Sequence, residues 1–100
     1  MVIRMRIYDT TGPNPSATQI FFEKVKPVHE RHGATFLGRF IDEKGRHVVM
    51  WSYPDRETMF DIQQRVEKDE ETIRNRELRI SSGLHGVPFE EFLLDPTQPG

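Results

Sequence analysis

The stretch from residue 34 to residue 53 constrains the fold most, because it predicts a β-hairpin whose two strands are apolar on both faces. Two runs rich in aromatic and β-branched residues, 35–41 and 47–53, flank a polar loop in which Gly45 can take the left-handed conformation that closes a short hairpin. The apolar residues at consecutive positions are Phe36, Leu37, Phe40, Ile41, Val48, Val49, Met50 and Trp51. A sheet that is apolar on both faces has to be covered on both faces.

Two further segments predict strands. Residues 2–9 alternate, so that Ile3, Met5 and Ile7 share one face of a strand. Residues 87–94 form the last strand. Because Pro88 cannot donate a backbone hydrogen bond, this strand is expected at an edge of the sheet.

The segment between the first strand and the hairpin predicts a helix. Ser16 is the expected N-cap, and an apolar stripe at helical spacing continues to Val28. Pro27 predicts a kink or an early end near Lys26. Gly33, after two basic residues, predicts the stop.

A second helical region follows the hairpin. Asp55 is the expected N-cap of a helix with an apolar stripe, and Asp69 is the expected cap of a further helical stretch that ends at residues 81–83. The first stripe consists of Met59, Ile62 and Val66, and the second stretch carries Ile73, Arg76 and Ile80. The charge-rich residues 67–79 are expected to form a solvated helix face.

The order β-α-β-β-α-β is that of the ferredoxin-like α+β fold. Right-handed connections place both helices on one face of a four-stranded antiparallel sheet. We expect the helices to cover the face with Ile3, Met5 and Ile7. The other face then exposes aromatic side chains from several strands, too large an apolar patch for a monomer. A second copy packed against it, in a two-fold homodimer, covers that face.

The composition fits one globular domain, residues 1–100, with 35% hydrophobic and 30% charged residues. A net charge of −2 without a block of basic residues argues against nucleic-acid binding. No apolar run approaches the roughly 20 residues of a membrane span. The lack of cysteine excludes disulfides and thiolate chemistry, and no signal-peptide core is evident, so a cytoplasmic location is predicted.

Several segments, in their order and spacing, resemble the NIPSNAP family. They are Arg31-His32-Gly33, Gly38-x-Phe40, the run WSYPDR at 51–56, the opening 3–8 and the closing 89–96. The resemblance spans nearly the whole chain and implies the dimeric α+β barrel fold. That superfamily includes cofactor-independent monooxygenases of antibiotic biosynthesis, haem-handling enzymes and stress-response proteins. The resemblance transfers no set of catalytic residues.

Arginines and aromatic residues on two strands are the candidate ligand-binding residues. If the helices cover Ile3 and its neighbours, then Arg4, Arg6 and Tyr8 point into the space between the two subunits. Trp51 and Tyr53 share one face of the second hairpin strand, and their apolar bodies and polar tips suit the wall of a cavity. This pattern predicts a pocket for a small, flat, acidic or aromatic organic molecule.

Two more candidates belong to this set, Arg39 and His32. The sequence leaves open which face of the first hairpin strand carries Arg39. The alternative interpretation is that the arginines pair with Glu90, Glu91 or Asp42 and only hold the barrel together, since buried charges must be paired in any case.

The four histidines do not predict a metal site. His29 and His32 lie three apart near a helix end, but zinc sites need three or four ligands and no acidic residue stands at a recognisable spacing. His32 is the more natural helix C-terminal residue, and His47 and His85 are expected at a strand end or in a loop.

The functional alternatives are an enzyme and a scaffolding module. The enzyme would be a cofactor-independent oxygenase or isomerase that uses His32, Tyr8 or Trp51 on an aromatic substrate. No phosphate loop, dinucleotide motif or Ser-His-Asp spacing is present, so no cofactor is predicted. The scaffolding module would have a filled barrel and no site.

Overall fold

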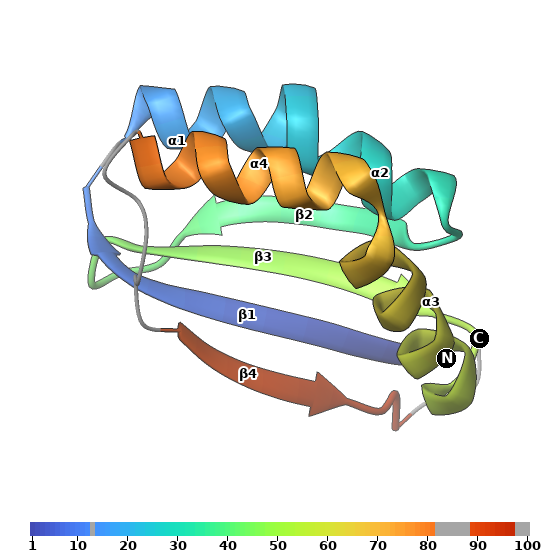
Figure 1. Ribbon diagram of the computed structural model, residues 1–100. Coiled ribbons are helices and arrows are strands. Elements are labelled where there is room, and N and C mark those ends of the chain that lie inside the picture. Colours follow the sequence, from blue (N-terminus) through green and yellow to red (C-terminus); the bar gives the residue numbers. More distant parts are fainter. Residues whose placement is uncertain (13, 82–88, 98–100) are drawn as a thin grey trace.

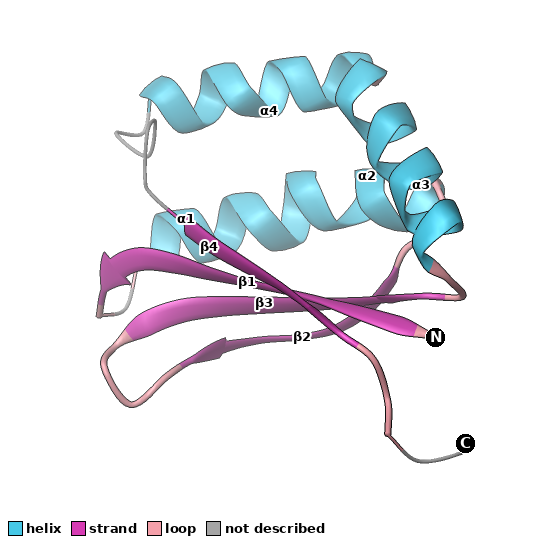
Figure 2. Ribbon diagram, turned by 90° about the horizontal axis from the view of Figure 1, so that it is seen from below, coloured by secondary structure: helices cyan, strands magenta, loops and turns pink. Residues whose placement is uncertain are grey.

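The computed structural model describes residues 1–12, 14–81 and 89–97 and shows a four-stranded antiparallel sheet with the described helices on one face (Figures 1 and 2). The elements are β1 (Val2–Thr11), α1 (Pro15–Ile20), the π-helical turn η1 (Phe21–Val25), α2 (Lys26–Arg31), β2 (Thr35–Ile41), β3 (Arg46–Tyr53), α3 (Arg56–Lys68), α4 (Glu70–Ser81) and β4 (Phe89–Leu94). The strand order β2-β3-β1-β4 confirms the ferredoxin-like fold, with β4 at an edge. The described residues do not include Pro88, His85 or the expected helix end at 82–83.

The β2–β3 hairpin closes as predicted. Gly45 has φ +81°, the left-handed conformation that the loop requires. The Asp42 carboxylate accepts hydrogen bonds from the backbone N–H groups of Lys44 at 2.9 Å and Arg46 at 2.8 Å. These bonds satisfy loop donors locally and fix the hairpin register.

A β-bulge in β2 determines which face carries Arg39. The register shifts between Phe36 and Gly38, which makes Leu37 an extra residue in the strand. Beyond the bulge, Arg39 lies opposite Val49 of β3. Its side chain therefore lies on the face that the helices cover.

The expectation that Ile3, Met5 and Ile7 face the helices is wrong. Arg4, on the alternate face of β1, is 6% exposed and lies opposite Trp51 of β3, which is 2% exposed. Directly opposed residues in an antiparallel pair share a face, so the burial of Trp51 beneath the helices places Arg4 there too. The alternation in β1 shows which residues share a face of the strand. Which of the two faces the helices cover depends on the neighbouring strand β3.

The first helical segment begins at Pro15, and the expected N-cap at Ser16 is wrong. The side chain of Asn14 accepts a hydrogen bond from the N–H of Ala17 at 3.0 Å. Pro15 occupies the first helical position, where its missing N–H leaves nothing unsatisfied. Asn14 is therefore the N-cap, and Ser16 already lies within the helix.

A π-helical turn, rather than a kink or an early end, accommodates Pro27. The N–H of Lys26 bonds to the carbonyl of Phe21, five residues back, so the turn before Pro27 is wider than an α-helical one. The helix then continues to its C-cap at His32. Gly33 follows at φ +107° and is the predicted stop.

Two aspartates begin α3 and α4 as predicted. Asp55 accepts a hydrogen bond from the N–H of Thr58 at 2.7 Å, and Asp69 accepts one from the N–H of Glu71 at 2.9 Å. The backbone of Asp69 is extended, which ends α3 and turns the chain into α4 (Figure 1). As a result α4 packs against α1, η1 and α3, and it lies farther from the sheet than α1 and α2 do (Figure 2).

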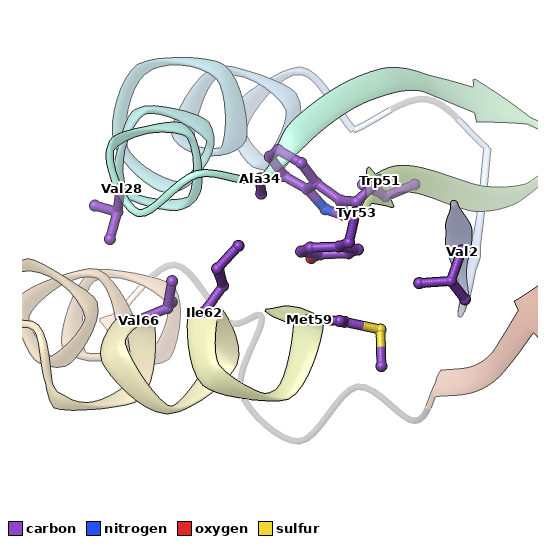
Figure 3. Close-up of a cluster of buried hydrophobic side chains, with 9 residues drawn as sticks. Val2, Val28, Ala34, Trp51, Tyr53, Met59, Ile62 and Val66 are labelled. Carbon is purple, nitrogen blue, oxygen red and sulfur yellow. The ribbon is translucent and has the colours of Figure 1, made fainter. Parts of the chain in front are cut away.

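The described core lies where α3 covers the sheet. Met59, Ile62 and Val66 of α3 are buried with Tyr53 of β3 and Val28 of α2 (Figure 3). Fully burying an apolar side chain of this size contributes roughly 1.5–3 kcal/mol. The predicted stripe of α3 is confirmed.

Helix α4 does not bury the two isoleucines of the predicted helical stretch. Ile73 and Ile80 remain 48% and 47% exposed, whereas Asn75 is only 8% exposed. The helix turns a polar side inward because it does not reach the apolar sheet. None of the helices within 14–81 has the length and apolar composition for crossing a membrane.

The sheet face away from the helices is apolar and open. Phe40, Phe92 and Leu94 are 51%, 44% and 38% exposed. The ring of Phe40 lies over Gly38, where an added Cβ would clash with the ring. No helix in the described parts of the chain lies on this face (Figure 2).

Candidate functional site

A cavity of about 460 Å³ lies between the covered face of the sheet and the helices. Strands β1, β2 and β3 contribute residues on the sheet side, and α1, η1 and α2 contribute residues on one flank. Helix α4 contributes Thr72, Asn75, Arg76 and Arg79 on the helix side. The cavity exists because α4 stands away from the sheet (Figure 2).

Cations dominate the charged lining of the cavity. Its ionisable lining includes five arginines and one carboxylate, that of Glu67. The arginines are Arg4, Arg6, Arg39, Arg76 and Arg79. Such an excess of guanidinium groups in a partly dehydrated space attracts anions.

Glu91 of β4 partly offsets this charge. Its Oε1 pairs with Nε of Arg4 and lies 3.2 Å from Nε of Arg6. The interpretation that arginines on the strands pair with acidic residues thus holds for Arg4 and Arg6. Glu91 is thus one carboxylate shared by two guanidinium groups.

Arg39 points into the cavity and is held there by three neighbours. Its Nη1 donates to Oγ1 of Thr18, and its guanidinium lies 5.4 Å from the ring centroid of Phe21. His47 Nε2 lies 2.7 Å from the carbonyl oxygen of Gly12, which only accepts, so Nε2 carries the proton. The Nδ1 of His47 is then free to accept from Nη2 of Arg39 at 3.2 Å.

His29 of α2 stacks on Trp51. The ring centroids lie 4.8 Å apart and the planes differ by 21°. Burial, and then the positive charges of Arg4 and Arg6, lower the pKa of His29 to about 4. The ring is therefore neutral near pH 7. Its Nδ1 is buried without a hydrogen-bond partner among the described residues.

Asn75 ties the inward side of α4 to the π-helical turn. Its Nδ2 donates to the carbonyl oxygen of Lys24 at 2.9 Å. The turn itself contributes Phe21 and Val25 to the lining of the cavity. This bond sets the position of α4, and with it Arg79, relative to the sheet.

Five of the seven predicted ligand-binding residues line this one cavity: Arg4, Arg6, Tyr8, Arg39 and Trp51. The predicted location between two subunits is wrong for them, because the helices cover their face of the sheet. The cavity therefore lies within a single chain.

The other two predicted residues lie elsewhere. Tyr53 packs in the core beside Met59 (Figure 3), where burial raises the pKa of its hydroxyl. His32 caps α2, and its Nε2 lies 2.8 Å from Oδ2 of Asp69. Hydrogen bonds from His32, Arg31 and the Glu71 N–H hold the pKa of the Asp69 carboxyl far below its usual range.

Among the histidines and arginines that line the cavity, the sequence interpretation missed four: His29, His47, Arg76 and Arg79. A signal existed for His29, which stands four residues after Val25 and eight after Phe21, on the apolar side of the helix. No local signal marked the two arginines, because the inward side of α4 follows from the turn at Asp69.

His29 and His32 do not share an ion site, since one stacks on Trp51 and the other binds Asp69. Within residues 1–12, 14–81 and 89–97, no group of three histidine or acidic side chains is placed to hold a metal ion.

Solved structures share this fold over the whole chain. An uncharacterised NIPSNAP domain protein from Burkholderia xenovorans has a TM-score of 0.79 and 18% identity, with 100% of both chains covered. A NIPSNAP family protein from Agrobacterium tumefaciens has a TM-score of 0.77 and 16% identity over 96% of this chain and 92% of that one. An antibiotic biosynthesis monooxygenase has a TM-score of 0.54 and 17% identity over 98% and 100%.

At the level of sequence, no family model and no curated protein matches the chain. At the identities given above, structural similarity establishes the fold, and activity has to be argued from the site.

Proposed function

From the premise that this chain has the fold of NIPSNAP proteins, in the dimeric α+β barrel superfamily, we propose that it binds a small planar organic acid in the cavity beneath α4. The observation that carries this proposal is the lining itself, in which five arginines and one carboxylate surround a cavity with aromatic walls. The volume of about 460 Å³ lies within the usual range for small-molecule sites.

The arginines come from both sides of the cavity. Arg4 and Arg6 lie on the sheet and share Glu91, whereas Arg79 lies on α4 and has a buried Nε without a partner among the described residues. A buried guanidinium is costly unless it is paired. A carboxylate within the cavity would supply that pairing, and guanidinium groups bind carboxylates in a two-pronged geometry.

The aromatic walls favour a flat ligand. Trp51, Phe21 and Tyr8 line the space next to the arginines. An aromatic or conjugated acid would stack on these rings while its carboxylate reaches the cations.

We also propose that the chain is a homodimer formed by the open sheet face. Phe40, Phe92 and Leu94 lie on that face and are about half exposed. Packing two such faces together would remove the apolar patch from water with two-fold symmetry. The ligand would then bind within each chain, on the side of the sheet away from the interface. A cytoplasmic location remains a prediction from the sequence.

Isothermal titration calorimetry with benzoate tests the binding proposal. The Arg79→Met variant is expected to weaken binding roughly 10- to 100-fold, the size of one charge-assisted hydrogen bond. Arg74→Met is the matched control, because Arg74 lies on the same helix, is exposed and does not line the cavity. It should bind within about twofold of the wild type. Unchanged binding by Arg79→Met contradicts the proposed site beneath α4. No binding by the wild type contradicts the proposal and favours the scaffolding module.

The second candidate function is a cofactor-independent oxygenase or isomerase. What favours it is that Tyr8, Trp51 and the neutral ring of His29 line one cavity, so a proton acceptor would lie beside an aromatic substrate. His32, the acid or base expected from the sequence, is outside the cavity and has no part in this proposal. Turnover of an aromatic substrate under air, lost on substitution of His29, would support it.

A further inference from the structure

His29 lines the cavity and has a buried ring nitrogen that no described residue binds. The ring forms part of the cavity lining, and its stacking on Trp51 fixes the plane in which its nitrogens lie. Nδ1 is buried and has no partner among the described residues. Leaving a buried polar atom unpaired is unfavourable. The hydrogen-bond partner of Nδ1 therefore has to come from a molecule other than the described residues, such as a ligand.

The surroundings favour a neutral ring with an available lone pair. Positively charged side chains face His29 from the packed elements: Arg4 and Arg6 of β1, Arg79 of α4 and, when protonated, His32 of α2. Burial and these charges disfavour an imidazolium, and its pKa is lowered to about 4. In the neutral ring one nitrogen carries the proton and the other has a lone pair that can accept a hydrogen bond.

We propose, building on the anion-binding function above, that His29 selects the ligand: its Nδ1 accepts a hydrogen bond from a hydroxyl group of a planar hydroxy acid whose carboxylate is held by the arginines. The cations bind the carboxylate, Trp51 and Phe21 contact the ring, and His29 distinguishes an acid with a correctly placed hydroxyl from one without it. A site with a buried unpaired acceptor disfavours ligands that leave the acceptor unpaired, which is how such sites gain selectivity.

Calorimetry with a small panel of acids tests this assignment at pH 7.5. The probes are benzoate, the three isomeric hydroxybenzoates and the corresponding methoxybenzoates. At least one hydroxybenzoate should bind the wild type roughly three- to tenfold more tightly than benzoate, the range expected for one net hydrogen bond. The methoxy analogue, which cannot donate, should lose this advantage.

The His29→Phe variant separates selectivity from binding. Phenylalanine retains a ring against Trp51 but has no nitrogen, so hydroxybenzoate and benzoate should bind this variant with affinities that differ less than about twofold. If the variant fails to fold, the ring ¹⁵N signals of His29 in the wild type answer the same question. The unprotonated nitrogen should shift with the preferred hydroxybenzoate and not with benzoate.

The outcomes distinguish the two proposals. Benzoate binding with no hydroxyl advantage, or with an advantage that persists in His29→Phe, overturns the role of His29 and leaves the anion site intact. An unmoved ¹⁵N signal on hydroxybenzoate binding has the same meaning. If no probe binds the wild type, the anion site is wrong and the assignment of His29 falls with it.

Discussion

The imidazole of His29 lies almost parallel to the indole of Trp51, with ring centroids 4.8 Å apart. The chain contains one tryptophan, so its indole emission comes from Trp51. Both rings line the arginine-rich cavity, and burial and the charges of Arg4 and Arg6 lower the pKa of His29. The fluorescence of Trp51 can therefore be used to follow the protonation of His29 in the cavity.

The fluorescence of Trp51 should titrate with His29. An imidazolium quenches indole emission more strongly than a neutral imidazole does, so acidification should quench the emission with a midpoint near pH 4. Saturating benzoate should move that midpoint upward, because a carboxylate beside Arg4 and Arg6 offsets charges that disfavour protonation. A midpoint near 6.5, or one that persists in His29→Phe, would show that the ring is not in the buried, cationic setting described above.

The stability of the fold should fall with acidification because of the same residue. The folded pKa of His29 is lowered to about 4 from 6.5, so between these values the unfolded chain binds a proton that the folded chain does not. Stability is therefore lost as the pH falls from about 6.5 to 4, by up to about 3 kcal/mol for a shift of this size. Urea denaturation of the wild type and of His29→Phe at several pH values in this range measures the free energy of unfolding of each. Parallel curves for the two proteins would contradict the assignment.

Asp69 should stabilise the turn between α3 and α4 in two ways. Its Oδ1 caps α4, and its Oδ2 pairs with His32 and Arg31. Asp69→Asn keeps a capping side chain and loses the charge, whereas Asp69→Ala loses both. Thermal denaturation at pH 7 should rank the wild type above Asp69→Asn and Asp69→Ala last.

The pH dependence of Asp69 separates the charge from the cap. Because the folded pKa of Asp69 is depressed, its charge contributes stability above the unfolded pKa of about 3.9, and this contribution is lost as the pH falls below it. The deficit of Asp69→Asn should therefore shrink in acid, while that of Asp69→Ala keeps its capping part. A deficit of Asp69→Asn that does not change with pH would contradict the ion-pair account.

The open sheet face should hold the homodimer together. Phe40→Glu places a carboxylate in the proposed interface of each copy. It should weaken dimerisation at least about a hundredfold, because a charge that loses its water in an interface is costly unless it is paired. Phe60→Glu is the control, because Phe60 is 54% exposed against 51% for Phe40 but lies on α3, on the other side of the sheet. Sedimentation velocity at micromolar concentration measures both. A monomeric wild type, or Phe40→Glu that still dimerises as the wild type does, would contradict this interface.

The features that depend on one residue and its immediate neighbours could be predicted from the sequence. The hairpin, the Gly33 stop and the two aspartate caps each depend on one residue and its immediate neighbours, and each is confirmed. Ser16 was a sound cap candidate, but an Asn-Pro pair two residues earlier competes for the same role.

The faces of the elements could not be read in the same way. Strand alternation in β1 is symmetric, so only the burial of Trp51 in β3 distinguishes the face with Arg4 from the face with Met5. The direction of α4 depends on a contact between distant residues, in which Asp69 Oδ2 accepts from Nη2 of Arg31 at 2.6 Å. Five of the seven candidate residues therefore share one cavity, but the sequence did not predict where this cavity lies or which residues of α4 line it.

Crystals grown with 4-bromobenzoate test the central claim most directly, because the anomalous signal of bromine locates the ligand without interpretation of weak density. The account predicts a bromine peak within the cavity between the sheet and α4, close to Trp51, with the carboxylate reaching Arg79 or the arginines of β1. A fully occupied peak between the open sheet faces of two subunits, or no peak within the cavity at saturating ligand, would contradict it.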